Sequence, residues 1–208
     1  MKQAKLRLLL GAILSVLLVS KVFPSPIAST PQTTVALLTE SSSVNKGESI
    51  WLGLQFKLSE GWHTYWKNPG DSGLPLQARW VVPKYVELGA IQWPVPHRQS
   101  YSEFMNFGYD DETTLLVKLN VSKDAPETSF PLTVHLQWLV CSLVCIPEEA
   151  TLEVIIKVTA NNISVRPDFP ITTLQAIASK LPLPLASQIV VSANKETINI
   201  TTDWTNKQ

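Results

Sequence analysis

The stretch LTVHLQWLVCSLVCIPEEATLEVIIKV, residues 132–158, predicts two β-strands joined by a tight connection. Apolar residues recur at every second position in both halves, which is the period of a half-buried strand. The apolar face of the first half is Leu132, Val134, Leu136, Trp138 and Val140, and that of the second half is Leu152, Val154, Ile156 and Val158. Cys141 and Cys145, the only cysteines in 208 residues, stand at the two ends of the connection. Paired strands place Cβ atoms about 4.5–5.5 Å apart, close to the roughly 3.5–4.5 Å of a disulfide, so the hairpin favours a bridge between them.

The chain before this hairpin shows the same β pattern. Strands are expected at residues 34–40, 50–58, 76–82, 86–93 and 113–121, where apolar positions run between clusters of glycine and proline. The segment 97–110, HRQSYSEFMNFGYD, lacks that alternation and is expected to be a loop rich in aromatic residues. No helical period interrupts the series. About seven short strands at this spacing predict an all-β fold, an antiparallel β-sandwich over residues 33–160.

The C-terminal part of the chain differs from the sandwich. Residues 161–170 are expected to be a linker. A helix is expected over residues 171–180, where apolar residues follow helical spacing, and two short strands are expected at 188–193 and 197–202. One helix and two strands cannot bury a core of their own, so residues 171–208 are interpreted as the incomplete start of a second region, a short mixed helix and strand fragment.

The N-terminus predicts export. A basic start is followed by a short apolar run and then by small residues and prolines, so residues 1–28 are interpreted as a secretory signal peptide. The run is too short for an ordinary membrane span, which needs about 20 apolar residues; an uncleaved N-terminal anchor is the alternative. Removal of this segment deletes four basic residues and no acidic one, which moves the formal net charge from 0 to −4. That balance argues against nucleic acid as a partner.

Two interpretations of the cysteine pair remain open from the residues alone. Exported domains often carry structural disulfides. A loop of about five residues, however, stabilises a fold by only roughly 2 kcal/mol in the chain-entropy model, against roughly 4.7 kcal/mol for a loop of about 100 residues. Strained or exposed bridges are also the labile ones, which favours redox exchange. The alternatives are therefore a redox-active pair and a non-catalytic binding module with a purely structural disulfide.

The residues around the pair predict neither an activated thiol nor a metal site. Glu148 and Glu149 follow closely, and carboxylates raise a thiol pKa, whereas no Lys or Arg stands within five residues of either cysteine. An attacking thiolate is therefore expected to come from a partner protein. The three histidines have no zinc-ligand spacing to the cysteines, so no metal and no cofactor are expected.

Aromatic residues gather in two further places. Trp62, Tyr65 and Trp66 precede the Pro/Gly-rich segment, and Tyr101, Phe104, Phe107 and Tyr109 lie in the predicted loop. Aromatic residues in β-proteins are mostly core, yet aromatics packed in a loop can also cover a reactive group. A sugar-binding platform is only weakly indicated, because no constellation of acidic or amide residues surrounds the tryptophans.

Four blocks of the sequence together resemble a known family. They are GWHTYWKNPGDSGLP (61–75), WP (93–94), FGYDDETTLLVKL (107–119) and WLVCSLVCIPEEATLEV (138–154). In this order they resemble the N-terminal periplasmic domain of the DsbD family of thiol:disulfide interchange proteins, especially its ScsB-like branch. The resemblance covers residues 33–160 and implies an immunoglobulin-like sandwich in the periplasm with a redox-active cysteine pair.

The resemblance also implies partners and roles for the cysteines. In the family, the domain receives electrons from a membrane-embedded domain and passes them to periplasmic disulfide isomerases and reductases of the thioredoxin fold. Cys141 and Cys145 are then the exchanging pair, and Cys145 forms the mixed disulfide with the partner. Reduced Cys145 is expected to attack the partner's disulfide, and Cys141 to resolve the intermediate.

The family shields its cysteine pair with a cap. By resemblance, the cap is expected over residues 100–107, with Phe104 as the lid residue. Tyr101 and Phe107 belong to the same cap, and Trp62 and Tyr65 are expected to line the site from the neighbouring strand. The sequence departs from the family in two respects. Its cysteines are more closely spaced than in the best-studied members, and it reaches Gln208 without a membrane domain, so the donor is expected to be a separate chain or to be missing from a shortened product.

Overall fold

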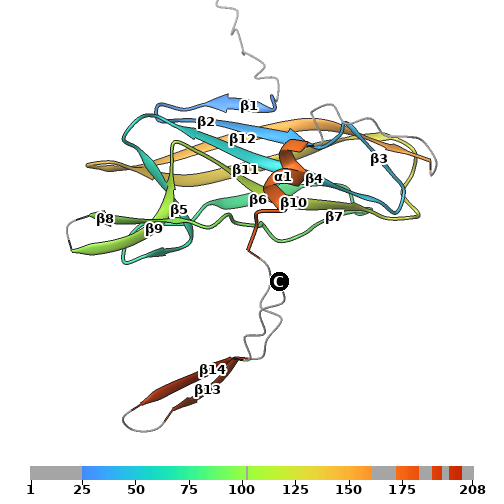
Figure 1. Ribbon diagram of the computed structural model, residues 1–208. Helices are drawn as coiled ribbons and strands as arrows, with labels where there is room; N and C mark the ends of the chain where they lie inside the picture. Colours follow the sequence, from blue (N-terminus) through green and yellow to red (C-terminus); the bar gives the residue numbers. More distant parts are fainter. Residues whose placement is uncertain (1–24, 102, 161–171, 183–188, 194–196, 203–208) are drawn as a thin grey trace, which may run out of the picture.

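The structure is a computed structural model that describes residues 25–101, 103–160, 172–182, 189–193 and 197–202. Up to residue 160 the described chain forms two β-sheets that pack face to face (Figure 1). The predicted all-β, immunoglobulin-like sandwich is therefore confirmed. The predicted linker lies outside the described residues, as does most of the predicted signal peptide; the remainder of that segment reaches into the first strand.

The first sheet has five strands in the order β1-β2-β4-β10-β7, with antiparallel neighbours throughout. They are β1 (Ile27–Ser29), β2 (Thr33–Thr39), β4 (Ser49–Leu58), β10 (Glu112–Val121) and β7 (Val86–Leu88). The period of two decides which side chains enter the core. On β4, Ile50, Leu52, Leu54 and Phe56 are buried, whereas Lys57 is exposed.

The second sheet has seven strands. Its main order is β3 (Ser43–Asn45), β12 (Cys145–Thr159), β11 (Ser129–Cys141), β5 (His63–Gly70), β9 (Phe104–Asp110) and β8 (His97–Tyr101), and β6 (Gln77–Val81) pairs with β11 beside β5. β3 runs parallel to β12, and the other pairs are antiparallel. The sequence correctly predicted β11 and β12 as a hairpin.

The core between the sheets is built mainly from the apolar faces of β4, β10, β11 and β12. The predicted apolar face of β11, from Leu132 to Val140, is at most 3 % exposed. Trp138 closes the core near the cysteine end, where its ring meets the edge of the Phe56 ring at a centroid distance of 5.4 Å. Full burial of a side chain of this kind contributes about 1.5–3 kcal/mol, so this face holds the hairpin firmly on the opposite sheet.

β11 changes its neighbour along its length, and this change creates the surroundings of the cysteines. From Thr133 to Gln137 it pairs with β6, whereas near its end only Val140 and Cys141 pair with β5, opposite Thr64 and His63. Beyond Thr64, β5 leaves β11 and continues alongside β9. The segment that connects β5 to β6 therefore lies where β11 passes from one partner strand to the other.

The expectation of a loop over residues 97–110 was wrong. This segment forms the hairpin β8–β9, with Tyr101 paired to Phe104 across its tip. Alternation failed as a signal here because the face of β9 that carries Asn106 and Gly108 is buried although neither residue is apolar. Figure 1 shows this hairpin projecting from the same end of the sandwich as the tip of the β11–β12 hairpin.

The C-terminal elements also appear where the sequence predicted them. The helix α1 (Thr172–Ala178) buries Leu174, and Gln175 donates a 2.7 Å hydrogen bond from Nε2 to Oε1 of Glu40. A Cβ atom on Gly53 of β4 would lie 2.8 Å from a Leu174 methyl carbon, so α1 packs directly on the outer face of the first sheet. β13 (Ile189–Ala193) and β14 (Ile198–Thr202) pair with each other. No helix within the described ranges is long and apolar enough to cross a membrane.

Candidate functional site

The two cysteines form a disulfide across the tip of the β11–β12 hairpin. Cys141 is the last residue of β11 and Cys145 the first of β12, and the ladder pairs them directly. Their Cα atoms are 4.1 Å apart. The turn between them is closed by a 3.0 Å hydrogen bond from the backbone N–H of Ser142 to the carbonyl oxygen of Val144. The predicted bridge is therefore present, and its geometry follows from the strand register.

The two cysteines differ sharply in accessibility. Cys141 is 2 % exposed, whereas Cys145 is exposed. The turn residues Leu143 and Val144 are 84 % and 61 % exposed. A thiolate from another protein can thus approach the bridge from the Cys145 side. Attack on that sulfur breaks the S–S bond and leaves the buried Cys141 sulfur as the departing thiolate.

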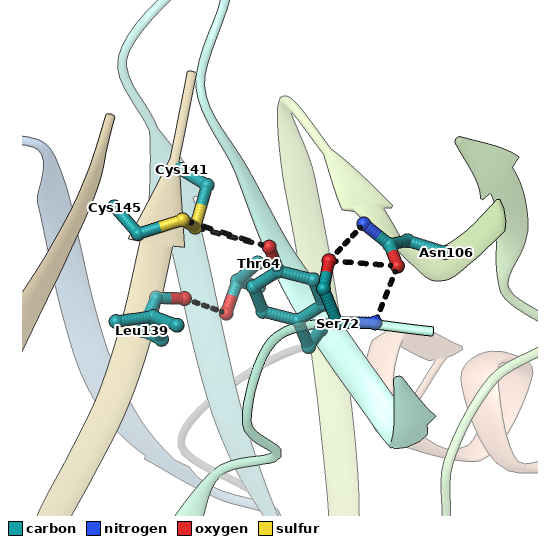
Figure 2. The surroundings of a disulfide bond; sticks show 7 residues. Thr64, Ser72, Asn106, Leu139, Cys141 and Cys145 are labelled. Carbon is teal, nitrogen blue, oxygen red and sulfur yellow. Dashed lines mark hydrogen bonds between the residues drawn. A yellow bond between two sulfur atoms is a disulfide. The ribbon is translucent and has the colours of Figure 1, made fainter. Parts of the chain in front are cut away.

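Tyr65 is the side chain that holds the buried sulfur. Its hydroxyl donates a hydrogen bond to Cys141 Sγ at 3.0 Å and lies 3.8 Å from Cys145 Sγ. The preceding residue anchors β5 at this point, because Thr64 Oγ1 donates to the carbonyl oxygen of Leu139 at 3.0 Å. Figure 2 shows the Thr64–Leu139 hydrogen bond beside the disulfide. The expectation that Tyr65 faces the pair from the neighbouring strand agrees with this contact.

The segment after β5 folds over the Tyr65 ring. Gly73 has a φ of +91°, and a Cβ atom there would lie 2.2 Å from Cε1 of Tyr65, so a side chain larger than hydrogen would collide with the ring. Ser72 and the buried Asn106 of β9 bind each other. The backbone N–H of Ser72 donates to Asn106 Oδ1 at 3.1 Å, and Asn106 Nδ2 donates to Ser72 Oγ at 2.9 Å (Figure 2). These bonds connect the β8–β9 hairpin to the segment that covers Tyr65, which in turn contacts the disulfide.

The electrostatic surroundings keep Tyr65 protonated. Burial raises the pKa of Tyr65, and a hydrogen bond from the Ser72 side chain opposes that rise in part. A neutral phenol is a hydrogen-bond donor, so the hydroxyl can donate to sulfur throughout the physiological pH range.

His63 is a neighbour of the disulfide that sequence reasoning missed. It pairs directly with Cys141 across the β5–β11 register, so the two side chains leave the same face of the sheet. Burial lowers the pKa of His63, while the Asp110 carboxylate acts in the opposite direction. Its Nε2 is buried without a hydrogen-bond partner, and its ring meets the edge of the Tyr65 ring at 5.4 Å. The local sequence around the cysteines holds no signal for it, because the register of two distant strands brings it there.

Glu148 does not act on the thiols in the way its position in the sequence suggested. It pairs with Trp138 and therefore points to the core face of the hairpin, away from the face of Cys141 and Cys145. Its buried carboxylate accepts hydrogen bonds from Thr30 Oγ1 at 2.7 Å, from the Gln32 N–H at 2.9 Å and from Thr33 Oγ1 at 2.7 Å. Glu148 ties the hairpin to the N-terminal strands instead.

The other aromatic residues predicted at the site lie on the β8–β9 hairpin or, in the case of Trp62, just before β5. Phe104 begins β9 and is 50 % exposed near the tip of the β8–β9 hairpin, opposite Tyr101 on β8. Phe107 packs edge-on against Trp66, with ring centroids 6.4 Å apart. Trp62 is half-buried and packs against the hydrophobic core. The described residues contain no cluster of His, Cys, Asp and Glu suited to a metal ion.

Comparisons with known proteins find one matching family and several similar structures. The family described as "Thiol:disulfide interchange protein DsbD, N-terminal" matches residues 34–157. The N-terminal periplasmic domain of ScsB from Proteus mirabilis has a similar structure, with a TM-score of 0.59 and 23% identity over 86% of this chain and 69% of that chain. The reduced N-terminal domain of DsbD from Neisseria meningitidis gives a TM-score of 0.36 and 14% identity over 58% of this chain and 86% of that chain. No curated protein sequence gives a significant match.

Proposed function

Because the chain belongs to the DsbD N-terminal domain family, we propose that it is a thiol–disulfide exchange domain that relays reducing equivalents through Cys141 and Cys145. The family match supports thiol–disulfide exchange as the reaction of this domain. The observation that supports these two residues is the exposed hairpin tip, where one cysteine is accessible and the other is buried. A bridge that only stabilised the fold has no need of this asymmetry.

Reduction of the domain begins at Cys145. A thiolate of the electron donor attacks Cys145 Sγ, the S–S bond breaks, and its electron pair leaves on Cys141 Sγ as a thiolate. A second thiolate of the donor then attacks the donor's own sulfur in the mixed disulfide and releases Cys145 as a thiolate. The donor is left oxidised and this chain carries a dithiol, so two electrons have moved.

Delivery to an acceptor reverses these steps. The Cys145 thiolate attacks the acceptor's disulfide and forms a mixed disulfide. The Cys141 thiolate then attacks Cys145 Sγ, which restores the bridge and releases the acceptor as a dithiol. Cys145 is thus the residue bonded to partners, and Cys141 is the resolving residue.

The partners proposed for the domain follow from the family. They are a membrane-embedded electron-donor domain and periplasmic disulfide isomerases or reductases of the thioredoxin fold, reached after export. The exposed Leu143 and Val144 beside Cys145 offer an apolar contact for such partners. A groove next to the hairpin, lined in part by Leu74, Leu139 and Pro147, extends that contact surface.

The β8–β9 hairpin is the proposed cap of the site. Phe104, with Tyr101, would limit access to the bridge until a partner binds. Phe107 lies on the other face of β9 and packs on Trp66, so it would support the hairpin, while Trp62 supports β5 from the core side. The hydrogen bonds between Asn106 and Ser72 support this role, because they join the hairpin to the segment that covers Tyr65.

Single cysteine variants and glutathione disulfide test the proposal. The reduced Cys141→Ser variant should form a stable adduct with one glutathione at Cys145, because no resolving thiol remains. The wild-type chain should release glutathione and close its bridge, and the Cys145→Ser variant should react much more slowly, because Cys141 is buried. Intact mass measured against time distinguishes these outcomes. Equal and adduct-free behaviour of both variants would overturn the assignment.

The reduction potential of the bridge provides the second measurement. A purely structural disulfide has a potential below about −300 mV, whereas an exchanger lies closer to the periplasmic reductases. Equilibration of the wild-type chain with glutathione and dithiothreitol buffers gives this value. A potential below about −300 mV would favour the binding module with a structural disulfide.

A further inference from the structure

The hydrogen bond from Tyr65 to Cys141 should differ greatly in strength between the two redox states. A disulfide sulfur is a weak acceptor, so the 3.0 Å contact contributes little in the oxidised chain. When the S–S bond breaks with Cys141 as the leaving group, the same sulfur becomes an anion. Hydrogen bonds to ionised acceptors are roughly twice as strong as neutral ones. An interaction that strengthens as the reaction proceeds accelerates it.

We propose that Tyr65 is a catalytic residue of the exchange reaction, whose hydroxyl stabilises the Cys141 thiolate as it departs and holds it ready to resolve the mixed disulfide. This inference rests on the proposed function. In reduction, the electron pair of the broken bond arrives on Cys141 Sγ while Tyr65 keeps its proton and donates the hydrogen bond. In the return step, the same thiolate attacks Cys145 Sγ, and the hydrogen bond weakens as the charge disappears.

The scaffold aims this hydroxyl independently of the sulfur. The Tyr65 ring is enclosed by Gly73, which has no room for a side chain, and Ser72 is fixed by Asn106. Thr64 fixes the backbone one residue earlier through Leu139. A donor already oriented before the charge develops needs no reorganisation during the reaction, which is why such donors are effective in buried sites.

Within the part of the chain that the structure describes, the elements packed around Cys141 offer no cation as an alternative source of thiolate stabilisation. The elements packed around Cys141 contribute His63 from β5, Asp110 from β9, Glu149 from β12 and Asp71 from the segment after β5. Burial lowers the pKa of His63, which favours its neutral form. The three carboxylates would oppose a thiolate. Among the described residues, Tyr65 is thus the side chain placed to favour the anion at Cys141.

The test uses the Cys145→Ser chain, in which Cys141 is the sole thiol. The pH dependence of its alkylation by iodoacetamide reports the pKa of Cys141. Tyr65→Phe in this background should raise that pKa by about one unit, because a hydrogen bond to a charged group is lost. Tyr109→Phe is the matched control. Tyr109 is equally buried, but its hydroxyl donates to the carbonyl oxygen of Pro94 at 2.8 Å, so the Cys141 pKa should not change.

A rate measured on the two-cysteine chain completes the test. Reduced glutathione should open the bridge about threefold more slowly in Tyr65→Phe than in the wild type, because a leaving group with a higher pKa departs more slowly. Ser72→Ala, which keeps the phenol but loosens it, should show a smaller shift in the same direction and serves if Tyr65→Phe does not fold. An unchanged pKa and rate, with glutathione still trapped by Cys141→Ser, would overturn the role of Tyr65 alone. Failure of that trapping would instead overturn the proposed function.

Discussion

Two buried polar clusters lie on opposite faces of the β11–β12 hairpin near its tip. On the core face, Glu148 gathers hydrogen bonds from Thr30, Gln32 and Thr33. On the outer face, Asn106 binds Ser72, which lies over Tyr65 and so leads to the Cys141 sulfur. Both clusters join elements that are far apart in the sequence. Only the outer-face cluster leads to a reacting atom, the Cys141 sulfur. The hairpin therefore separates residues that stabilise the fold, on its core face, from residues that influence the reaction, on its outer face.

The alternation of a β-strand accounts for this separation. Glu148 is three residues from Cys145 and therefore points to the opposite face. A negative charge placed this close on the same face would have hindered thiolate formation. On the core face the Glu148 side chain is satisfied by hydrogen-bond donors, and it stabilises the position of the N-terminal strands against β12.

The largest effect is expected in the core-face cluster around Glu148, on the free energy of unfolding. Glu148→Ala removes the acceptor of three buried or half-buried donors and should lower the free energy of unfolding by about 2–3 kcal/mol. Chemical denaturation of the oxidised chain measures this loss. The Cys141 pKa in the Cys145→Ser background should stay the same, because Glu148 does not face the sulfur.

Glu149→Ala is the control for this prediction. Glu149 is exposed and accepts one hydrogen bond, at 3.2 Å from Nε2 of the exposed Gln137. Its removal should change the free energy of unfolding by no more than about 0.5 kcal/mol. A shift of the Cys141 pKa in Glu148→Ala would show that the two clusters are coupled, against the separation inferred from the faces.

Asn106→Ala should affect both properties, with a smaller loss of stability. The side chain is 3 % exposed, and its removal leaves the Ser72 N–H without its acceptor, at a cost of about 1–2 kcal/mol. The freed segment should hold Tyr65 less firmly, so the Cys141 pKa should rise by less than in Tyr65→Phe. Denaturation and alkylation kinetics on the same protein measure the two effects. An unchanged Cys141 pKa would mean that packing around Gly73 alone positions the tyrosine.

The two clusters also differ in how far the sequence could predict them. The face of Glu148 follows from counting positions along the strand, and the same period correctly identified the buried face of β11. The Asn106 cluster required the registers of β5 with β9 and with β11, which no local pattern contains. Motif resemblance nevertheless predicted that Tyr65 and the residues around Phe104 share one site; Tyr65 contacts Cys141, and the role of Phe104 stays a prediction. It could not show that Asn106, a buried polar residue on a strand predicted to be a loop, joins them.

The smallest effect is expected from His63, which lies beside Cys141 on the outer face, and it concerns the pH dependence of the free energy of unfolding. Burial holds its pKa below the ordinary value of about 6.5, so in the window just below that value the unfolded chain binds more protons than the folded chain. Stability is therefore complete above about pH 6.5 and declines as the pH falls. His63→Gln should remove this decline, so the variant should lose less stability than the wild type between about pH 8 and about pH 5. Denaturation of both oxidised chains at the two pH values gives the comparison. Equal losses of stability in the wild type and the variant would mean that the His63 ring is as well solvated in the folded chain as in the unfolded one. A smaller loss in the variant would place a neutral, desolvated imidazole beside the disulfide and leave Tyr65 as the source of thiolate stabilisation.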